Sequence, residues 1–402
     1  MEDAVIVDYL RSPFSRARPR EPERDMFNSL RMDDVAAMLI KELIRRTGIK
    51  PEEINDVLFG TAMPMGEQWL YGGRDITFLA ELPFNVPAQH IDRQCASSMS
   101  TIHQGAMEIM LGYSEIVIAG GIEHMTHNPM PGPGIDMSRI MVAPNPRLFS
   151  EPEYKRYDMM TTVNMGLTAE KLFEQTDFTR DDMDRWALRS HQLAAKALEE
   201  GYFTGEIMPT EVQLPDGTKK VIDYDVSIRA DTSLEALADL QPSFKPDGHI
   251  TPGNSSPLNA GATAMVLMSK KKAKEYKLKP LAKIVSMGWA GVDPTVMGTG
   301  PVPASRMALK HSGLEVNDID YWEINEAFAI VALSTIKQLG IGPDKVNVKG
   351  GATAIGHPLG ATGTRLVGTL ARILGCENGR FGLATACVGG GQGAATIIER
   401  EK

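Results

Sequence analysis

An internal repeat constrains the fold of this 402-residue chain more than any other feature of its sequence. In the first half, a predicted helix is followed by Gly48-Ile49-Lys50 and Glu53-Ile54-Asn55, and then by a predicted strand. In the second half, a helix is followed by Gly313-Leu314-Glu315 and Asp318-Ile319-Asp320, and again by a strand. Because the chain is long for one hydrophobic core, we expect two copies of one α/β unit that face each other.

Hydrophobic periodicity predicts the order of elements within each copy. Apolar runs predict strands, and helical spacing predicts a helix at residues 33–46 and further helices just after Cys95 and His357. The predicted strands are residues 4–9, 54–61, 115–121 and 381–389. Because strand, helix and strand alternate, we expect a parallel α/β sheet, with the ligand site outside the carboxyl ends of its strands.

Residues from about 124 to 250 differ in composition, because prolines, methionines and charged residues replace the apolar runs of buried strands. We expect an inserted loop domain here, with helices at residues 167–175 and 180–200. Thr179 and Asp182 form a capping pair at the start of the second helix. Loops of this kind either cover a binding site or form an oligomer contact, and the sequence leaves both open.

Composition argues against several classes of function. The formal net charge of −9, with no evident basic face, argues against a nucleic-acid partner, so any acidic ligand must be met by cations gathered locally. No run approaches the roughly 20 apolar residues that span a bilayer, and the start of the chain lacks signal-peptide features. The cysteines Cys95, Cys376 and Cys387 form no paired framework and no metal-ligand spacing. We therefore expect a cytoplasmic protein without a metal site.

Cys95 lies where a predicted strand runs directly into a predicted helix. The positive end of a helix dipole and its unpaired N–H groups favour a thiolate, which makes Cys95 a candidate nucleophile. The alternative is a small buried hydrophobic residue, which is the commonest role of a free cysteine.

His357 lies in a stretch, residues 350–363, that is too rich in glycine for a packed helix or a central strand. The backbone of this stretch must therefore approach another part of the protein closely. His357 follows Ile319 by 38 residues, and Cys95 follows Ile54 by 41, so the repeat places the two at matching positions. A neutral imidazole there can take the Cys95 proton, although a histidine beside a proline is more often a turn residue.

Two further segments carry candidate site residues. Cys387 begins a second glycine-rich turn, whose N–H groups can point at a developing negative charge. Asn325 and Glu326 follow a predicted strand and open a helix, so Asn325 is either a helix cap or a group that holds a water or an oxyanion. Cys376, at a helix end, is interpreted as an inert residue.

Four separated motifs resemble those of the thiolase family, in the same order and spacing. They are Cys95 with Ala-Ser-Ser-Met, Asn325-Glu326-Ala327-Phe328, Gly356-His357-Pro358-Leu359-Gly360, and Cys387-Val388-Gly389-Gly390-Gly391. The resemblance covers nearly the whole chain and implies an α/β fold with a five-layered αβαβα core. That core is built from two repeated halves, residues 1–273 and 274–402, with the loop domain inserted in the first.

Within the family, the chain looks most like the degradative 3-ketoacyl-CoA type of bacterial fatty-acid β-oxidation. Gly121-Ile122-Glu123-His124-Met125 and Gly300-Pro301-Val302-Pro303-Ala304-Ser305 carry this narrower resemblance. The implied activity is an acyltransferase reaction, in which coenzyme A cleaves a 3-ketoacyl-CoA to acetyl-CoA and a shortened acyl-CoA through an acyl-cysteine. Coenzyme A is then a substrate, and no cofactor is implied.

The resemblance also implies roles for single residues. Cys95 would be acylated, His357 would activate it and donate to the enolate oxygen, and Cys387 would be the general acid and base. Asn325 would hold a water in one oxyanion hole, and the N–H groups of Cys95 and Gly389 would form another. Further implied contacts to coenzyme A and substrate come from Arg229, Ser256 and Met165. Ala260, where many members carry Asp, and Asn164 beside Met165, where some carry His, depart from the family pattern.

Other functions remain to be weighed at this stage. A biosynthetic thiolase that forms acetoacetyl-CoA would use the same residues, and a non-catalytic acyl-CoA-binding or scaffold subunit could keep the same fold. A ketoacyl synthase would lack a second catalytic cysteine. The expected assembly is a homodimer or homotetramer, with a hydratase/dehydrogenase subunit as a further possible partner.

Overall fold

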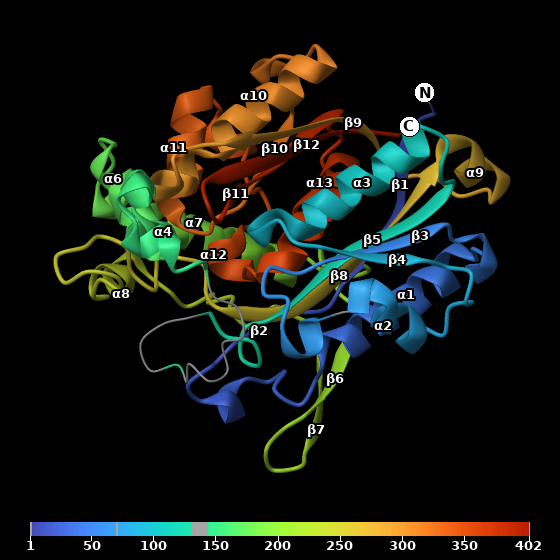
Figure 1. Ribbon diagram of the computed structural model, residues 1–402, viewed down its shortest axis with the longest axis horizontal. Helices are drawn as coiled ribbons and strands as arrows, with labels where there is room; N and C mark the ends of the chain where they lie inside the picture. Colours follow the sequence, from blue (N-terminus) through green and yellow to red (C-terminus); the bar gives the residue numbers. More distant parts are fainter. Residues whose placement is uncertain (1, 70, 131–134, 136–143, 402) are drawn as a thin grey trace.

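The elements of the molecule stack in five layers in the computed structural model, which describes residues 2–69, 71–130, 135 and 144–401 (Figure 1). Helices α10 and α11 cover the second half of the large sheet, α3 and α13 lie between its two halves, and α1 and α2 cover the first half. Their bounds are α1 Met32–Thr47, α2 Arg74–Leu79, α3 Ser97–Met110, α10 Pro301–Ser312, α11 Ala329–Leu339 and α13 Thr362–Cys376. The five-layered αβαβα core is therefore confirmed.

The strands of the two halves follow the same order. The first half runs β1-β8-β5-β3-β4, and the second runs β9-β12-β11-β10. The bounds are β1 Ala4–Arg11, β3 Asp56–Gly60, β4 Ala88–Ile91, β5 Ile116–His124, β8 Asn259–Ser269, β9 Ala282–Gly291, β10 Tyr321–Ile324, β11 Phe381–Val388 and β12 Gln392–Arg400. A short strand β2, Ser15–Arg16, pairs with the start of β8. The halves join where β1 pairs briefly with β9.

The sheet is mixed, so the expectation of a parallel sheet is only partly right. β3 pairs in parallel with β4 and β5, and β10 with β11, as the strand-helix-strand order predicts. By contrast, β8 and β12 run antiparallel to both of their long neighbours. No crossover helix separates β12 from β11, and an antiparallel pair needs only the tight turn that joins them.

The repeat is confirmed at the level of single elements. Helix α13 begins 265 residues after α3 (362 − 97), and β11 begins 265 residues after β5 (381 − 116). The same offset places Gly360, and not His357, opposite Cys95, so the predicted match is wrong by three residues. A Cβ on Gly360 would lie 2.5 Å from the Ile122 carbonyl oxygen and from Thr61 Cα, which leaves no room for a side chain there.

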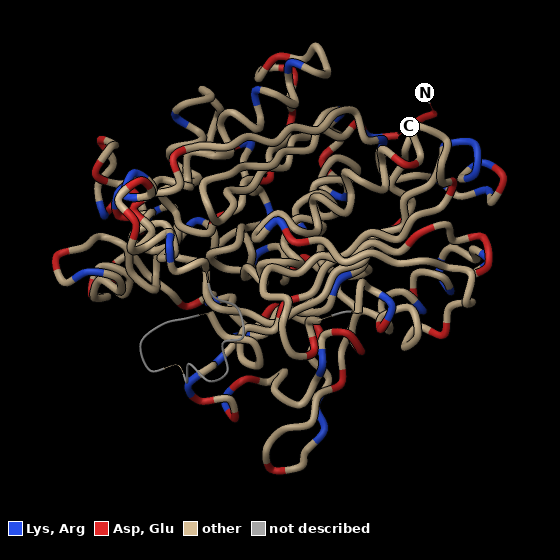
Figure 2. Tube along the Cα trace, in the orientation of Figure 1, with Lys and Arg blue, Asp and Glu red and all other residues tan. Residues whose placement is uncertain are grey.

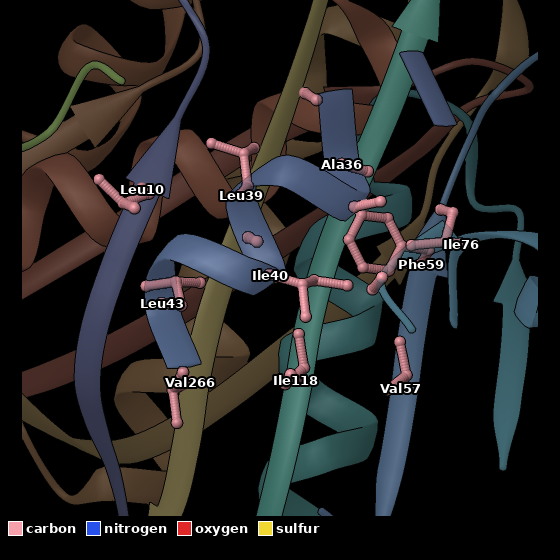
Figure 3. Packing of buried hydrophobic residues seen from close by; sticks show 14 of the residues in the cluster. Leu10, Ala36, Leu39, Ile40, Leu43, Val57, Phe59, Ile76, Ile118 and Val266 are labelled. Atoms are coloured by element: carbon pink, nitrogen blue, oxygen red, sulfur yellow. The ribbon is translucent and has the colours of Figure 1, made fainter. Parts of the chain in front are cut away.

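Three apolar clusters fill the spaces between the layers. Figure 3 shows the first, where Ile40 and Leu43 of α1 pack against Ile118 of β5 and Val266 of β8. A second cluster surrounds α3 and α13, and a third joins α10 and α11 to the second half of the sheet. Because each fully buried side chain of this kind contributes about 1.5–3 kcal/mol, these clusters hold the central helices rigidly under the site.

The described part of the inserted segment contains four short helices, the longer helix α7 and a hairpin. Its bounds are α4 Arg147–Ser150, α5 Met159–Thr162, α6 Met165–Glu174, α7 Arg180–Glu199, β6 Thr210–Gln213, β7 Lys219–Ile222 and α8 Leu234–Ala238. The capping pair is confirmed, since Thr179 and Asp182 cap each other reciprocally at the start of α7. Two further α-helices of the described part of the chain are α9 Lys270–Glu275 and α12 Ala352–Ile355. Within the described ranges, no helix is both long and apolar enough to cross a membrane.

A buried ion-pair network attaches the insert to β1. The Arg11 guanidinium lies 2.7 Å from Glu206 and 2.6 Å from Asp225, and all three side chains are fully buried. The Phe14 N–H donates to Asp225, and the Val226 N–H donates to the Phe14 carbonyl. Residues 225–229 of the insert therefore run beside residues 14–16.

Candidate active site

Cys95 lies in a single 3-10 turn between the end of β4 and the start of α3. The preceding residue, Gln94, has a φ of 44°, a left-handed conformation that is costly for a residue with a side chain. The Asp92 carboxylate accepts the Gln94 N–H at 2.7 Å and so supports the turn. Strained backbone of this kind is typical of functional sites, and nothing in the sequence signalled it.

The Cys95 thiol is neutral in this environment. Burial raises its pKa to about 12, and the charges of Glu123 and Asp92 act in the same direction. The Gly389 N–H, which donates to the sulfur, favours the thiolate but does not outweigh burial. The influence of the helix N-terminus on the thiol is thus outweighed, because burial disfavours the charged form more strongly. A base must take the proton during the reaction.

His357 lies in the loop between α12 and α13, where its ring has a defined tautomer. Its Nδ1 lies 2.6 Å from the Thr362 hydroxyl, which itself donates to the Pro358 carbonyl at 3.0 Å. Since the hydroxyl proton is used, Nδ1 must carry the ring hydrogen, and Nε2 keeps its lone pair. Burial, with a smaller effect of Arg365, lowers the His357 pKa to about 3. The imidazole is therefore neutral and available as a base at Nε2.

The Asn325 side chain faces that base. Its Nδ2 lies 3.3 Å from His357 Nε2, and both side chains are buried. Helix α11 begins only at Ala329, with Phe328 at its N-cap, so the predicted helix opening at Asn325 is wrong. The residues between β10 and α11 are held outside helix α11, because Glu326 accepts hydrogen bonds from Trp186 and Ser190 of α7. The Asn325 side-chain oxygen has no hydrogen-bond partner among the described residues, so it can accept a hydrogen bond in the site.

Cys387 and Gly389 approach Cys95 from the second half of the molecule. Cys387 lies near the end of β11, and burial raises its pKa, with a further contribution from the neighbouring Cys95. The turn that follows has left-handed φ values of 79° at Gly390 and 78° at Gly391, which side chains rarely adopt. This turn aims the Gly389 N–H at the Cys95 sulfur.

The glycine-rich stretch of residues 350–363 does approach other backbone closely, as predicted. A Cβ on Gly363 would lie 2.1 Å from the Met99 nitrogen of α3. The Thr364 N–H donates to the Ser98 hydroxyl, so the first turns of α3 and α13 are in contact. The stretch thereby brings the loop that holds His357 to the turn that holds Cys95. Among the described residues, no hydrogen bond joins the His357 ring to the Cys95 thiol.

Glu123 is a functional candidate that the sequence reasoning missed. Its buried carboxylate accepts the Ala62 N–H at 2.9 Å and the Gly360 N–H at 2.8 Å, so one side chain links both halves beside the site. The residue stood in the motif that carried the narrower resemblance. Its contact with the second half of the molecule, however, joins Glu123 to Gly360, which lies 237 residues later in the sequence.

The residues expected to meet coenzyme A lie on the insert and on the segment before β8. Ser256 donates from its nitrogen and its hydroxyl to the Ala327 carbonyl, two residues from Asn325. Arg229 is exposed, and its N–H donates to His191. Met165 begins α6, which Asn164 caps through the Leu167 N–H. Cys376 is exposed at the end of α13, in contrast to the buried Cys95 and Cys387.

One group of side chains offers possible metal ligands. Atoms of Glu67, His124 and His127 lie within 4.8 Å of one another. His127 is paired with Glu67 at 3.0 Å, and the second ring nitrogens of His124 and His127 face the carbonyls of Phe27 and Asn28. Protein groups thus already bond the ring nitrogens that a metal would need.

Comparison with known proteins decides the family. The family description "Thiolase, N-terminal domain" matches residues 4–271, and "Thiolase, C-terminal domain" matches residues 278–400. The chain belongs to the thiolase family. A Saccharophagus degradans protein named 3-ketoacyl-CoA thiolase is 43% identical over 403 residues, covering 99% of this thiolase and 98% of the relative. A Yersinia pestis protein of the same name is 42% identical, with both chains fully covered.

Solved structures agree with the fold of this thiolase. The structure of the Bacillus anthracis acetyl-CoA acetyltransferase superposes with a TM-score of 0.87 at 37% identity. That of human mitochondrial 3-ketoacyl-CoA thiolase also gives 0.87, at 32% identity. In both cases the match covers 100% of this chain and 99% of the other.

Proposed function

We propose that this thiolase cleaves 3-ketoacyl-CoA with coenzyme A, giving acetyl-CoA and a shortened acyl-CoA in fatty-acid β-oxidation. The observation that carries the proposal is that two neighbouring thiols, Cys95 and Cys387, lie beside the loop of His357, whose Nε2 faces Asn325. A nucleophile, a base and a second proton donor are what thiolysis requires.

In the proposed mechanism, His357 Nε2 takes the Cys95 proton as the sulfur attacks the 3-keto carbon. The C2–C3 bond then breaks, and acetyl-CoA departs as an enolate, stabilised by His357 and by a water on Asn325. The Cys387 thiol gives its proton to C2, which completes acetyl-CoA. The resulting thiolate takes the proton of an incoming coenzyme A.

The second half-reaction returns the enzyme to its starting state. The coenzyme A sulfur attacks the acyl carbon on Cys95, while the Gly389 N–H stabilises the carbonyl oxygen. Cys95 then leaves and recovers its proton from His357. Because every step is reversible, the same groups support the condensation that a biosynthetic thiolase carries out.

Acetoacetyl-CoA formation is the second candidate function, favoured by the similarity to the acetyl-CoA acetyltransferase of Bacillus anthracis. A series of 3-ketoacyl-CoA substrates of increasing chain length separates the two, with thiolysis followed by ultraviolet absorbance. The degradative function predicts turnover of medium and long chains. Turnover of acetoacetyl-CoA alone would establish the biosynthetic type.

Covalent labelling tests the third candidate, a non-catalytic scaffold. Mass spectrometry after incubation with an acyl-CoA should find an adduct on Cys95, and Cys95→Ser should fold but lose nearly all turnover. An adduct on Cys376, or none on any cysteine, would contradict the proposed function. Cys376→Ser is the matched control, because that thiol is exposed and outside the site.

We also propose a cytoplasmic homo-oligomer. Three unpaired cysteines are suited to a reducing compartment. Strand β4 is an edge of the sheet, and an edge strand with free N–H and C=O groups is a ready surface for pairing with another chain.

A further inference from the structure

Glu326 carries a fully buried carboxylate that takes no part in the proposed mechanism. Its Oε1 accepts hydrogen bonds from Trp186 Nε1 at 2.9 Å and from Asn347 Nδ2 at 2.8 Å. Its Oε2 accepts from the Ser190 hydroxyl at 2.8 Å and from the Thr353 N–H at 3.1 Å. The donors belong to helix α7, to helix α12 and to the loop before α12, so one carboxylate joins three parts of the chain.

A carboxylate in this position is costly, because burial removes it from water and no cation offsets its charge. In the described ranges, no ion pair within 4.0 Å includes Glu326. Figure 2 shows charged residues gathered mainly on the outer turns and helices of the molecule, where water solvates them. Apolar groups of similar shape can often replace a buried hydrogen-bonded set at little cost in stability. The bonds of Glu326 therefore suggest a purpose other than stability.

The neighbouring residue, Asn325, depends on its backbone for its position. Among the described residues, its side chain makes one hydrogen bond, from Nδ2 to His357 Nε2 at 3.3 Å. Its N–H donates to the Thr385 carbonyl of β11 at 2.9 Å, which fixes the backbone on one side. On the other side β10 has ended, and Glu326 holds the chain.

Asn347 extends this support to the residue before Asn325. Its side chain accepts the Ile324 N–H at 2.8 Å and donates to the Ile324 carbonyl at 2.9 Å, and its Nδ2 also donates to Glu326. Asn347 itself has a φ of 48°, a left-handed conformation that asparagine tolerates better than most residues. One pair of bonded side chains, Asn347 and Glu326, thus holds the backbone on both sides of Asn325.

The same carboxylate holds the helix that leads to His357. Helix α12 ends two residues before His357, and the Thr353 N–H near its start donates to Glu326. A Cβ on Gly351 would lie 2.2 Å from Glu326 Cδ, so the backbone before α12 passes directly against the carboxylate. The Gly351 N–H donates to the Ser190 hydroxyl, and Figure 1 shows α12 beside α7. Both members of the Asn325–His357 contact are therefore attached, through Glu326, to helix α7 of the insert.

We propose that Glu326 is a positioning residue, which holds Asn325 against His357 Nε2 and anchors both to helix α7. This inference rests on the proposed function and assigns a role in it to a residue that acts through Asn325. A displacement of about 1 Å in such a group can cost roughly 10²-fold in rate. Because Asn325 serves the enolate, the step at C2 of acetyl-CoA is the one that depends on Glu326.

Glu326→Gln tests this role, because it keeps the shape of the side chain but replaces one acceptor oxygen with an amide that cannot accept a hydrogen bond. Proton exchange at C2 of acetyl-CoA in deuterated buffer should fall roughly 10²-fold, while KM for coenzyme A should be nearly unaltered. In the Asn325→Ala background, Glu326→Gln should cause no further loss, because the residue that it positions is absent. A general defect of the fold would lower exchange by the same factor in both backgrounds.

Trp186→Phe is a milder variant that keeps the test decisive if Glu326→Gln does not fold. It removes one N–H donor but keeps a large aromatic ring, so exchange should fall roughly tenfold, again only when Asn325 is present. Glu170→Gln is the matched control. The Glu170 carboxylate, on helix α6, is also buried and also accepts backbone N–H groups. This control should exchange the C2 proton near the wild-type rate.

Wild-type exchange rates in the Glu326 and Trp186 variants would overturn the proposal. An equal loss with and without the Asn325 side chain, or an equal loss in Glu170→Gln, would also overturn it.

A crystal structure of Glu326→Gln, or of Trp186→Phe, separates this inference from the proposed function, because it does not depend on turnover. If wild type shows no thiolysis but the Asn325 amide has moved away from His357 in the variant, the positioning role stands and the proposed function fails. If thiolysis occurs but the variant retains both the Asn325–His357 contact and C2 exchange, the positioning role fails.

Discussion

His357 Nδ1 donates to the Thr362 hydroxyl across 2.6 Å, and this one contact determines which ring nitrogen carries the lone pair. Thr362 lies in the first turn of α13, so the orientation of the base is tied to the central helix layer. The hydroxyl can act as acceptor because its own proton is donated to Pro358. Thr362 is thus a positioning residue for the base.

Replacing Thr362 with Val should therefore lower kcat, because the ring hydrogen loses its acceptor and the other tautomer becomes available. We expect a loss of roughly tenfold to hundredfold, as for other small misplacements of a reacting group. Thr362→Ser should restore most of the rate, and thermal unfolding should show that both variants are folded. Equal rates in the Val and Ser variants would exclude this role.

The two thiols should separate into different chemical steps. Cys387→Ala should still accept an acyl group on Cys95 from an activated donor but should be roughly 10²–10⁴-fold slower in carbon–carbon chemistry. Cys95→Ala should fail at both. Proton exchange at C2 of acetyl-CoA in deuterated buffer measures the second step directly. Exchange at the wild-type rate in Cys387→Ala would show that this thiol is not the acid and base.

Acid should destabilise this thiolase through its buried histidines. Burial lowers the pKa of His103 to about 3, with a further effect of Arg93, and burial lowers that of His191 to about 4. His357 has a similarly low pKa. The unfolded chain binds these protons near pH 6.5, so this stability is present above pH 6.5 and is lost as the pH falls toward 4.

The contribution of one histidine is measured by comparing wild type with His103→Gln. Between pH 7 and pH 5, wild type should lose roughly 2 kcal/mol more free energy of unfolding than the variant. Carboxylates also titrate in this range, but they are the same in both proteins, so their contribution cancels in the difference between wild type and His103→Gln. Parallel pH curves in urea titrations would contradict the assignment of a neutral buried His103.

The edge strand β4 should pair with a second copy of the chain. A cavity of about 400 Å³ beside it is lined by β4, α3 and Trp289. Buried polar atoms of His90, Ser100 and His103 at this cavity have no hydrogen-bond partners among the described residues. Phe84, just before β4, is 92% exposed. These are features of a surface that another chain covers.

Light scattering at micromolar concentration should therefore give at least twice the monomer mass of 43.9 kDa. Gln89→Lys places a charge on the exposed edge and should shift the equilibrium toward monomer, because edge charges oppose strand pairing. Lys41→Gln, on the outer helix α1, is a control that should leave the mass unaltered. A monomeric wild type would contradict the proposal.

Much of the fold could be predicted because its signals are local. The αL glycines Gly48 and Gly313 end α1 and α10 at matching points of the repeat, and the Thr179 cap begins α7 where expected. The relative direction of two strands was predicted correctly only where a helix connects them, as in the parallel pairs. The antiparallel placement of β8 depends on where the insert returns the chain, which no local pattern encodes.

The sequence alone identified four candidate site residues: Cys95, His357, Asn325 and Cys387. It could do so because residue types and motif spacing are properties of the sequence itself. Their working states were decided by the tertiary structure. Contacts such as Asn325 with His357, and Gly389 with Cys95, join segments that only packing brings together. Burial is a property of the whole fold, and it raises the pKa of the Cys95 thiol to about 12 by penalising its charged form.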